Sequence, residues 1–185
     1  MTGWELPKTA EIGGKTYDIH TDYREILDIF ACLQDEDMPE FLRWRIAMNL
    51  FYNGQIPDCD FCEAAEFFRK FVCCGQPEQK DPGPQLLDWE KDAQVIVADV
   101  NKVAGQEIRA LPYLHWWTFL GWFQGIGEGN LSTLVSIRDK LRRGKKLEPW
   151  EQEYYRRNRS RVILPKKYSS GELAEQERLK ALLDQ

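Results

Sequence analysis

The feature that most constrains this chain is residues 111–126, its densest apolar stretch. A helix over 113–124 would be apolar on almost every side, and such helices lie in protein interiors. The stretch is shorter than the ~20 residues that cross a bilayer, and it contains His115 and Gln124, so we expect no membrane-spanning role. The residues that we expect to form the structural core are Leu114, Trp116, Trp117, Phe119, Leu120, Trp122 and Phe123.

Apolar residues recur at helical spacing in six further stretches, which predict helices over 22–33, 39–53, 58–74, 86–104, 131–141 and 148–165. Asp22 can cap the first of these helices, and Pro39 suits the first turn of the second. Gly54, Gly75 and Gly105 follow the ends of three of them, as glycine commonly does. The Pro- and Gly-rich residues 76–85 predict a loop.

Residues 6–20 predict a β-hairpin, because apolar and polar residues alternate on both sides of Gly13-Gly14, a pair suited to a tight turn. The chain as a whole is therefore expected to be mainly α, a compact bundle of about six to seven helices with a short N-terminal hairpin. Its 185 residues, 43% of them hydrophobic, are enough for one domain over 1–165. Residues 166–185 are expected to be a C-terminal tail, whose pattern would also fit a frayed helix.

The chemistry-bearing residues do not assemble into a known catalytic or metal motif. Cys59-x-x-Cys62 and Cys73-Cys74 would lie about 17 Å apart on one helix, whereas zinc ligands surround one point. The two histidines, His20 and His115, lack a nucleophile motif beside them. We therefore expect reduced thiols, no metal, no cofactor, no catalytic residue and no enzymatic activity.

The charge is uneven along the chain. Residues 1–100 carry a net charge of −11, whereas residues 101–185 carry +6, with 12 basic and 4 acidic residues over 138–167. This polarity predicts self-association or an anionic partner, although solvated helix faces would give the same pattern. The residues that we expect to bind a partner are Arg138, Arg142, Arg143, Lys145, Lys146, Tyr154, Tyr155, Arg156 and Arg157.

Three motifs together resemble a known family. They are residues 6–24, which begin Leu-Pro-Lys-Thr-Ala-Glu-Ile-Gly-Gly-Lys-Thr-Tyr; residues 88–93, Asp-Trp-Glu-Lys-Asp-Ala; and residues 113–119, Tyr-Leu-His-Trp-Trp-Thr-Phe. In motif spacing and in the Tyr154-Tyr155 helix, residues 5–165 resemble the "gp fifteen" family of tail-module proteins from siphophages and prophages of Gram-positive bacteria.

The resemblance implies a non-enzymatic tail assembly chaperone. Its partners would be the helical, hydrophobic tape-measure protein and, at a second step, the major tail protein. It would act in the host bacterial cytoplasm during infection or prophage induction and be absent from the mature virion. This agrees with residues 1–10, which lack the pattern of a signal peptide. The alternative function is a nucleic-acid-binding phage regulator that uses the basic stretch 138–167, although the net charge of −5 and the lack of a known binding module oppose it.

Overall fold

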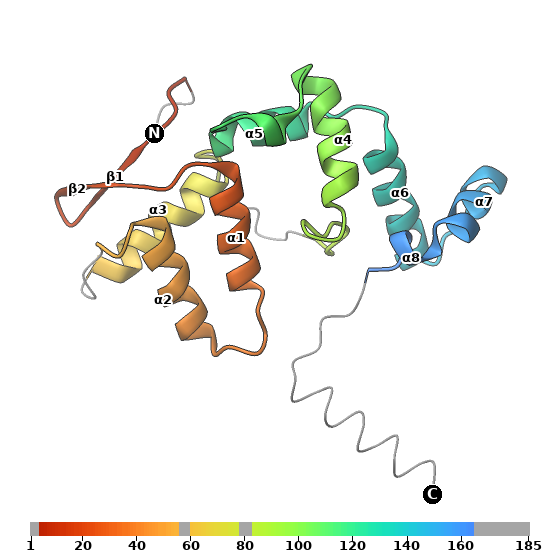
Figure 1. The fold of residues 1–185 in the computed structure, drawn as a ribbon. Coiled ribbons are helices and arrows are strands. Elements are labelled where there is room, and N and C mark those ends of the chain that lie inside the picture. The colour runs from red at the N-terminus through yellow and green to blue at the C-terminus, as the bar shows by residue number, and fades with distance from the viewer. Residues whose placement is uncertain (1–3, 56–59, 78–82, 165–185) are drawn as a thin grey trace, which may run out of the picture. The chain divides into compact units, whose positions relative to one another are not determined.

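The computed structural model describes residues 4–55, 60–77 and 83–164, and these form two compact units. The first unit contains the N-terminal hairpin and helices α1 to α3, and the second contains α4 to α8 (Figure 1). The predicted class, mainly α with an N-terminal hairpin, is confirmed. The predicted single domain over 1–165 stays a prediction, and the predicted tail over 166–185 lies outside the described residues.

The hairpin pairs β1 (Thr9–Ile12) with β2 (Lys15–Asp18) in antiparallel register, with Ala10 opposite Tyr17. Gly13 and Gly14 make the turn with φ angles of +56° and +74°, which residues with a side chain rarely adopt. A Cβ atom on Gly13 would lie 2.9 Å from the Asp60 carboxylate. The Gly13 N–H also donates to Glu63 at 3.0 Å, so the turn is held against the start of α3.

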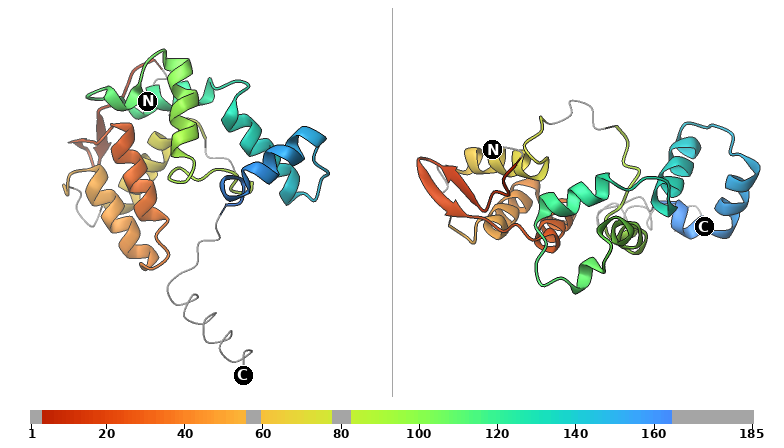
Figure 2. Two further views of the ribbon diagram at one scale, coloured as in Figure 1. Left: turned by 45° about the vertical axis from the view of Figure 1, so that its right-hand side comes forward. Right: turned by 90° about the horizontal axis from the view of Figure 1, so that it is seen from above.

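Three helices complete the first unit: α1 (Tyr23–Leu33), α2 (Glu40–Phe51) and α3 (Phe61–Val72). The Asp22 carboxylate caps α1 by accepting the Arg24 N–H at 3.0 Å, as the sequence predicts. Helix α2 packs against both α1 and α3, and Figure 2 shows the three helices side by side.

The core of the first unit is an aromatic cluster between α2 and α3. The Phe51 ring lies 5.0 Å from the Phe68 ring and 5.2 Å from the Phe71 ring. The buried Tyr52 hydroxyl donates to the Ala64 carbonyl at 2.9 Å, and burial raises the pKa of Tyr52 well above its ordinary value. The cluster therefore joins the two helices without an unpaired hydroxyl.

The second unit runs α4 (Ala93–Ala104), the 3₁₀ turn η2 (Ile108–Ala110), α5 (Trp116–Gln124), α6 (Asn130–Arg142), α7 (Pro149–Arg157) and α8 (Arg159–Val162). Helix α4 contacts η2, α5 and α6, while α8 contacts α6 and α7. The short helices α7 and α8 follow α6 around a bend (Figures 1 and 2). None of the helices that the structure describes is long and apolar enough to cross a membrane.

Helices α4 and α5 begin later than predicted, each because a side chain accepts backbone N–H groups. Helix α4 begins at Ala93 rather than residue 86, because the Asp88 carboxylate accepts the N–H groups of Glu90 and Lys91 and holds residues 88–91 in a turn. Helix α5 begins at Trp116 rather than residue 113. His115 Nδ1 accepts the Trp117 N–H at 3.0 Å and so caps the helix.

The predicted helix over 148–165 is two helices, α7 and α8. Asn158 ends the first and begins the second, and its side-chain amide donates to the Tyr154 carbonyl at 3.1 Å. This break brings the described helices to eight α-helices, one more than the seven stretches predicted from the sequence.

Helix α6 is capped by a residue from α4. The buried Asp99 carboxylate accepts the Leu131 N–H at 2.8 Å and pairs with Lys102 at 2.6 Å. A Cβ atom on Gly129 would lie 2.8 Å from the same carboxylate, so the close approach requires glycine at this position. The cap fixes the start of α6 against α4.

The predicted core residues of 113–124 differ in burial. Leu114, Trp116, Trp117 and Phe119 are buried, whereas Leu120, Trp122 and Phe123 are half-buried. The Trp116 ring stacks on Phe119 at 5.6 Å, and the Trp89 ring lies 6.2 Å from Trp116.

Replacing Trp116 with Ala should destabilise the protein by about 3–5 kcal/mol, because it empties a large, fully packed site. The matched control is Trp150→Ala in the same unit. Trp150 is 57% exposed, whereas Trp116 is 1% exposed, so the control should change stability by no more than about 0.5 kcal/mol. Urea denaturation followed by circular dichroism measures both, and equal destabilisation by the two variants would contradict the expectation.

Candidate partner-binding surfaces

A partly apolar groove runs along α2 next to the first turn of α3. It consists of two adjoining hollows of about 580 and 300 Å³, which share Arg45 and Phe61. The remaining lining residues are Glu40, Phe41, Leu42, Trp44, Ile46, Met48, Asn49, Gly54 and Cys62. At ~1.5 Å per residue, the stretch of α2 from Glu40 to Asn49 gives about 15 Å of wall, enough for just under three turns of a partner helix.

The groove exists because α2 is apolar on both sides. Ala47, Met48 and Phe51 face the interior and are buried, while Phe41 is 69% exposed and Leu42 is 37% exposed. An exposed apolar surface of this kind is typical of a binding site. The Trp44 ring is held in place at the groove, because it packs edge-on against Phe68 and the Arg69 guanidinium lies over it, 5.6 Å from the ring centre.

The sequence analysis did not predict this groove. Its signal was the run Phe-Leu-Arg-Trp-Arg-Ile-Ala-Met-Asn-Leu-Phe over 41–51, which places apolar residues all around a helix. Such a pattern predicts either full burial or a second contact surface. Only the packing of α1 and α3 shows which side of α2 stays open.

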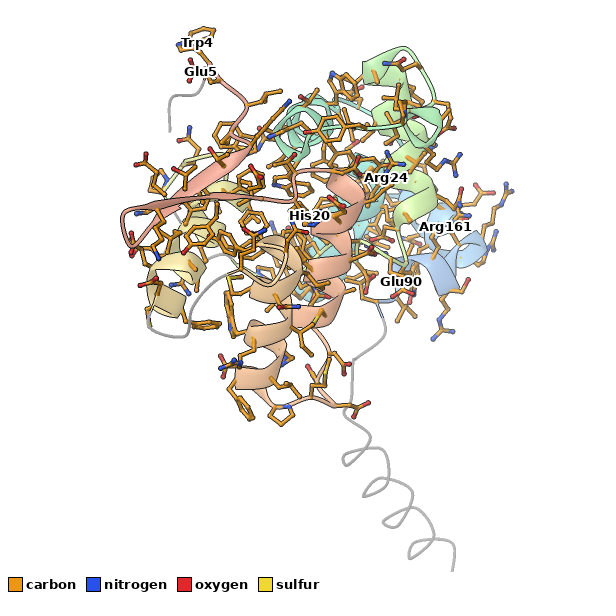
Figure 3. All side chains as sticks on the ribbon, turned by 60° about the vertical axis from the view of Figure 1, so that its left-hand side comes forward. Trp4, Glu5, His20, Arg24, Glu90 and Arg161 are labelled. Atoms are coloured by element: carbon orange, nitrogen blue, oxygen red, sulfur yellow. The ribbon has the colours of Figure 1, made fainter. Side chains whose placement is uncertain are left out.

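A second surface is the cationic one on α6 and α7. Arg142, Arg143, Lys145, Lys146, Arg156 and Arg157 are exposed, as expected of partner-binding residues. Arg143 pairs with Asp139 at 2.8 Å and Arg157 pairs with Glu153 at 2.5 Å, both one turn apart on a helix. Arg161, labelled in Figure 3, adds a further exposed cation on α8.

Arg138, which the sequence analysis placed on this surface, belongs to the interior instead. Its side chain is 4% exposed and forms an ion pair with fully buried Asp92, with N···O distances of 2.5 and 2.8 Å. The remaining N–H groups donate to the carbonyls of Leu86, Arg161 and Val162 at 2.7–2.9 Å. The guanidinium therefore has no donor left for a partner.

The two tyrosines assigned to the same surface are half-buried. Tyr154 and Tyr155 pack against a small core cluster formed by Leu134, Ile137, Leu147 and Val162. Their rings thus contribute to the packing of α7 on α6. Contact of either ring with a partner stays a prediction.

The histidines and cysteines take structural positions. His115 caps α5, as described above, and His20 lies beside the first turn of α1 (Figure 3). His20 Nδ1 is 2.7 Å from the Glu25 carboxylate, and its Nε2 contacts the Asn53 side chain.

The cysteines in the described part of the chain are Cys32, Cys62, Cys73 and Cys74, all as free thiols. Burial raises the pKa of the Cys32 thiol, and it raises that of Cys74 to about 11, so both stay protonated at neutral pH. Cys59 lies outside the described residues. Over residues 4–55, 60–77 and 83–164, no group of three Cys, His, Asp or Glu side chains is arranged to hold a metal ion.

Residues 4–164 match the family described as Bacteriophage Gp15 protein, so the match covers most of the chain and both units. The chain belongs to the bacteriophage Gp15 family. No curated protein and no solved structure shows significant similarity to this Gp15-family protein. The match confirms the family that the three sequence motifs predict, and it makes the chain a bacteriophage protein.

Removing the Arg138 side chain of this Gp15-family protein should be costly. Arg138→Ala leaves the Asp92 carboxylate buried without its partner, a change that typically costs about 3–5 kcal/mol. Arg142→Ala, on the same helix but exposed, is the control and should stay within about 0.5 kcal/mol of wild type. Thermal unfolding of both variants tests this assignment, and a fully stable Arg138→Ala protein would refute it.

Acid should weaken the contact between α6 and α7. The Lys140 ammonium donates to the Glu151 carboxylate at 2.7 and 2.8 Å, and the Glu148 N–H donates at 2.8 Å, and together these lower the pKa of Glu151. A lowered folded-state pKa adds stability above the unfolded value of about 4.3, and this contribution disappears as the pH falls through the folded-state pKa.

Glu151→Gln should therefore lower the melting temperature at pH 7 and match wild type at the acid end of a titration from pH 7 to pH 3. Glu128→Gln, an exposed carboxylate in the same unit, is the control and should follow wild type across the range. A Glu151→Gln deficit that stays constant with pH would contradict this explanation.

Proposed function

We propose that this bacteriophage protein is a non-enzymatic tail assembly chaperone that binds a helical segment of the tape-measure protein in the groove along α2. The observation that carries the proposal is the groove itself, a partly apolar surface hollow along α2 in a protein of a phage family. Helices that lay an apolar stripe into such a groove are a common mode of recognition. Tape-measure proteins are long, helical and hydrophobic, so they supply segments of this kind.

Coating such a segment would keep its apolar surface from aggregating before the tail tube forms around it. This step would take place in the host bacterial cytoplasm, and the protein would be released before the virion is complete. The major tail protein would be recruited second, as the family resemblance implies.

The test uses overlapping peptides from the tape-measure protein of the same phage, with binding measured by calorimetry. Leu42→Lys places a charge in the groove and should weaken binding of the best peptide at least tenfold, or about 1.4 kcal/mol. Leu50→Lys is the matched control, because Leu50 is a similarly exposed leucine of the same helix outside the groove lining. It should bind within about twofold of wild type.

Two results would reject the proposal. One is that wild-type protein binds no tape-measure peptide. The other is that Leu42→Lys and Leu50→Lys weaken binding equally.

The alternative function, a nucleic-acid-binding regulator, is favoured by the exposed cations of α6 and α7. Phosphate contacts make binding fall steeply with salt. Retention of duplex DNA that disappears with rising salt and with Lys145→Glu/Lys146→Glu would support the regulator over the chaperone, provided that the tape-measure peptides do not bind.

A further inference from the structure

The connection between α1 and α2 forms a compact acidic surface, which we call the acidic tip: Asp35, Glu36, Asp37 and Glu40. Residues 34–42 contain no lysine or arginine, and Glu36, Asp37 and Glu40 are exposed. The Asp35 carboxylate accepts the Asp37 N–H at 2.9 Å, and Arg43 of α2 donates to the Leu33 carbonyl at 2.9 Å. These bonds fix the loop, so its negative charges occupy defined positions.

The connection between α6 and α7 is its cationic counterpart, which we call the basic elbow: Arg142, Arg143, Lys145 and Lys146. All four residues are exposed, and residues 140–147 contain no acidic residue. The Lys145 N–H donates to the Lys140 carbonyl at 2.8 Å, and the Lys140–Glu151 pair fastens the start of α7 to α6. The elbow is therefore also held in place by its flanking helices.

The two surfaces match in charge and in the apolar groups beside them. Each carries four charges of one sign on a helix–helix connection, and each adjoins a large exposed aromatic ring, Phe41 at the acidic tip and Trp150 at the basic elbow. Exposed ion pairs are individually weak and are screened by salt. When the two surfaces meet, the two rings can bury apolar area, which adds to the weak ion pairs.

We propose that the acidic tip of one copy docks on the basic elbow of a second copy. Like-charged surfaces repel, so the contact is between unlike surfaces. Two copies can pair reciprocally in a closed dimer with two tip–elbow contacts, or each copy can bind one neighbour through its tip and another through its elbow, which gives a ring or a filament. This inference does not rest on the proposed function, but Glu40 and Phe41 also line the groove, so a docked copy would cover part of it. The substitutions in the test below leave both of these residues unchanged.

The test is a charge exchange between two variants, followed by analytical ultracentrifugation at low salt. Lys145→Glu/Lys146→Glu removes the net positive charge of the elbow. Glu36→Lys/Asp37→Lys removes the net negative charge of the tip. Wild type should form species larger than a monomer that shrink on dilution or added salt. Each variant alone should sediment as a monomer, whereas an equimolar mixture should recover a one-to-one complex, because the unaltered tip of one variant then meets the unaltered elbow of the other.

The matched control is Lys8→Glu/Lys15→Glu, which makes the same change in net charge at two exposed positions of the hairpin segment. It should assemble like wild type, and circular dichroism should show native helix content for all variants. Three results would overturn the proposal: a monomeric wild type at every concentration, variants that assemble alone as wild type does, or a mixture of folded variants that stays monomeric.

Discussion

The second unit depends on the ion pair and the hydrogen bonds that the buried Arg138 guanidinium makes. Its five N–H groups all reach acceptors, two on the Asp92 carboxylate and three on backbone carbonyls from residues 86, 161 and 162. Asp92 in turn accepts the Asp88 N–H at 3.0 Å. One side chain of α6 thereby joins the segment before α4 to the end of α8, although these segments are 70 or more residues apart in sequence.

This network specifies the arrangement of helices more than it adds net stability. Removing a guanidinium and a carboxylate from water costs several kcal/mol, and their attraction offsets that cost only when every donor and acceptor is satisfied. Here the planar guanidinium meets Asp92 with two parallel bonds, a geometry that lysine could not reproduce. Any other packing of α8 on α6 would leave buried donors unpaired, so the correct packing is favoured over alternatives.

Local signals made the hairpin and most helices predictable. Gly13-Gly14 and the Asp22 cap act within a few residues, and the structure shows both as expected. The misplaced starts of α4 and α5 also have local causes, because Asp88 and His115 accept backbone N–H groups just after them in the sequence. Histidine is a less common cap than aspartate or serine, so the sequence pattern of 113–124 does not mark His115 as the residue that caps this helix.

The partner-binding surfaces depend on contacts that a single sequence does not reveal. In the sequence, Arg138 belongs to the same basic stretch as the exposed residues near it. Only the structure shows that Arg138 is buried against Asp92, 46 residues away. Similarly, the sequence shows that α2 is apolar all round, but only the positions of α1 and α3 decide that Phe41 and Leu42 line an open groove.

The carbonyls that hold Arg138 also set a limit on truncation. Two of the three carbonyl acceptors belong to Arg161 and Val162, close to the end of the described chain. A shortened gene product that stopped at Asn158 would lose both acceptors and Val162, which is 1% exposed in the small core cluster. A fragment of the second unit that keeps these contacts therefore extends through Val162, and a stop codon or protease cut a few residues earlier would remove α8 together with its contacts to α6.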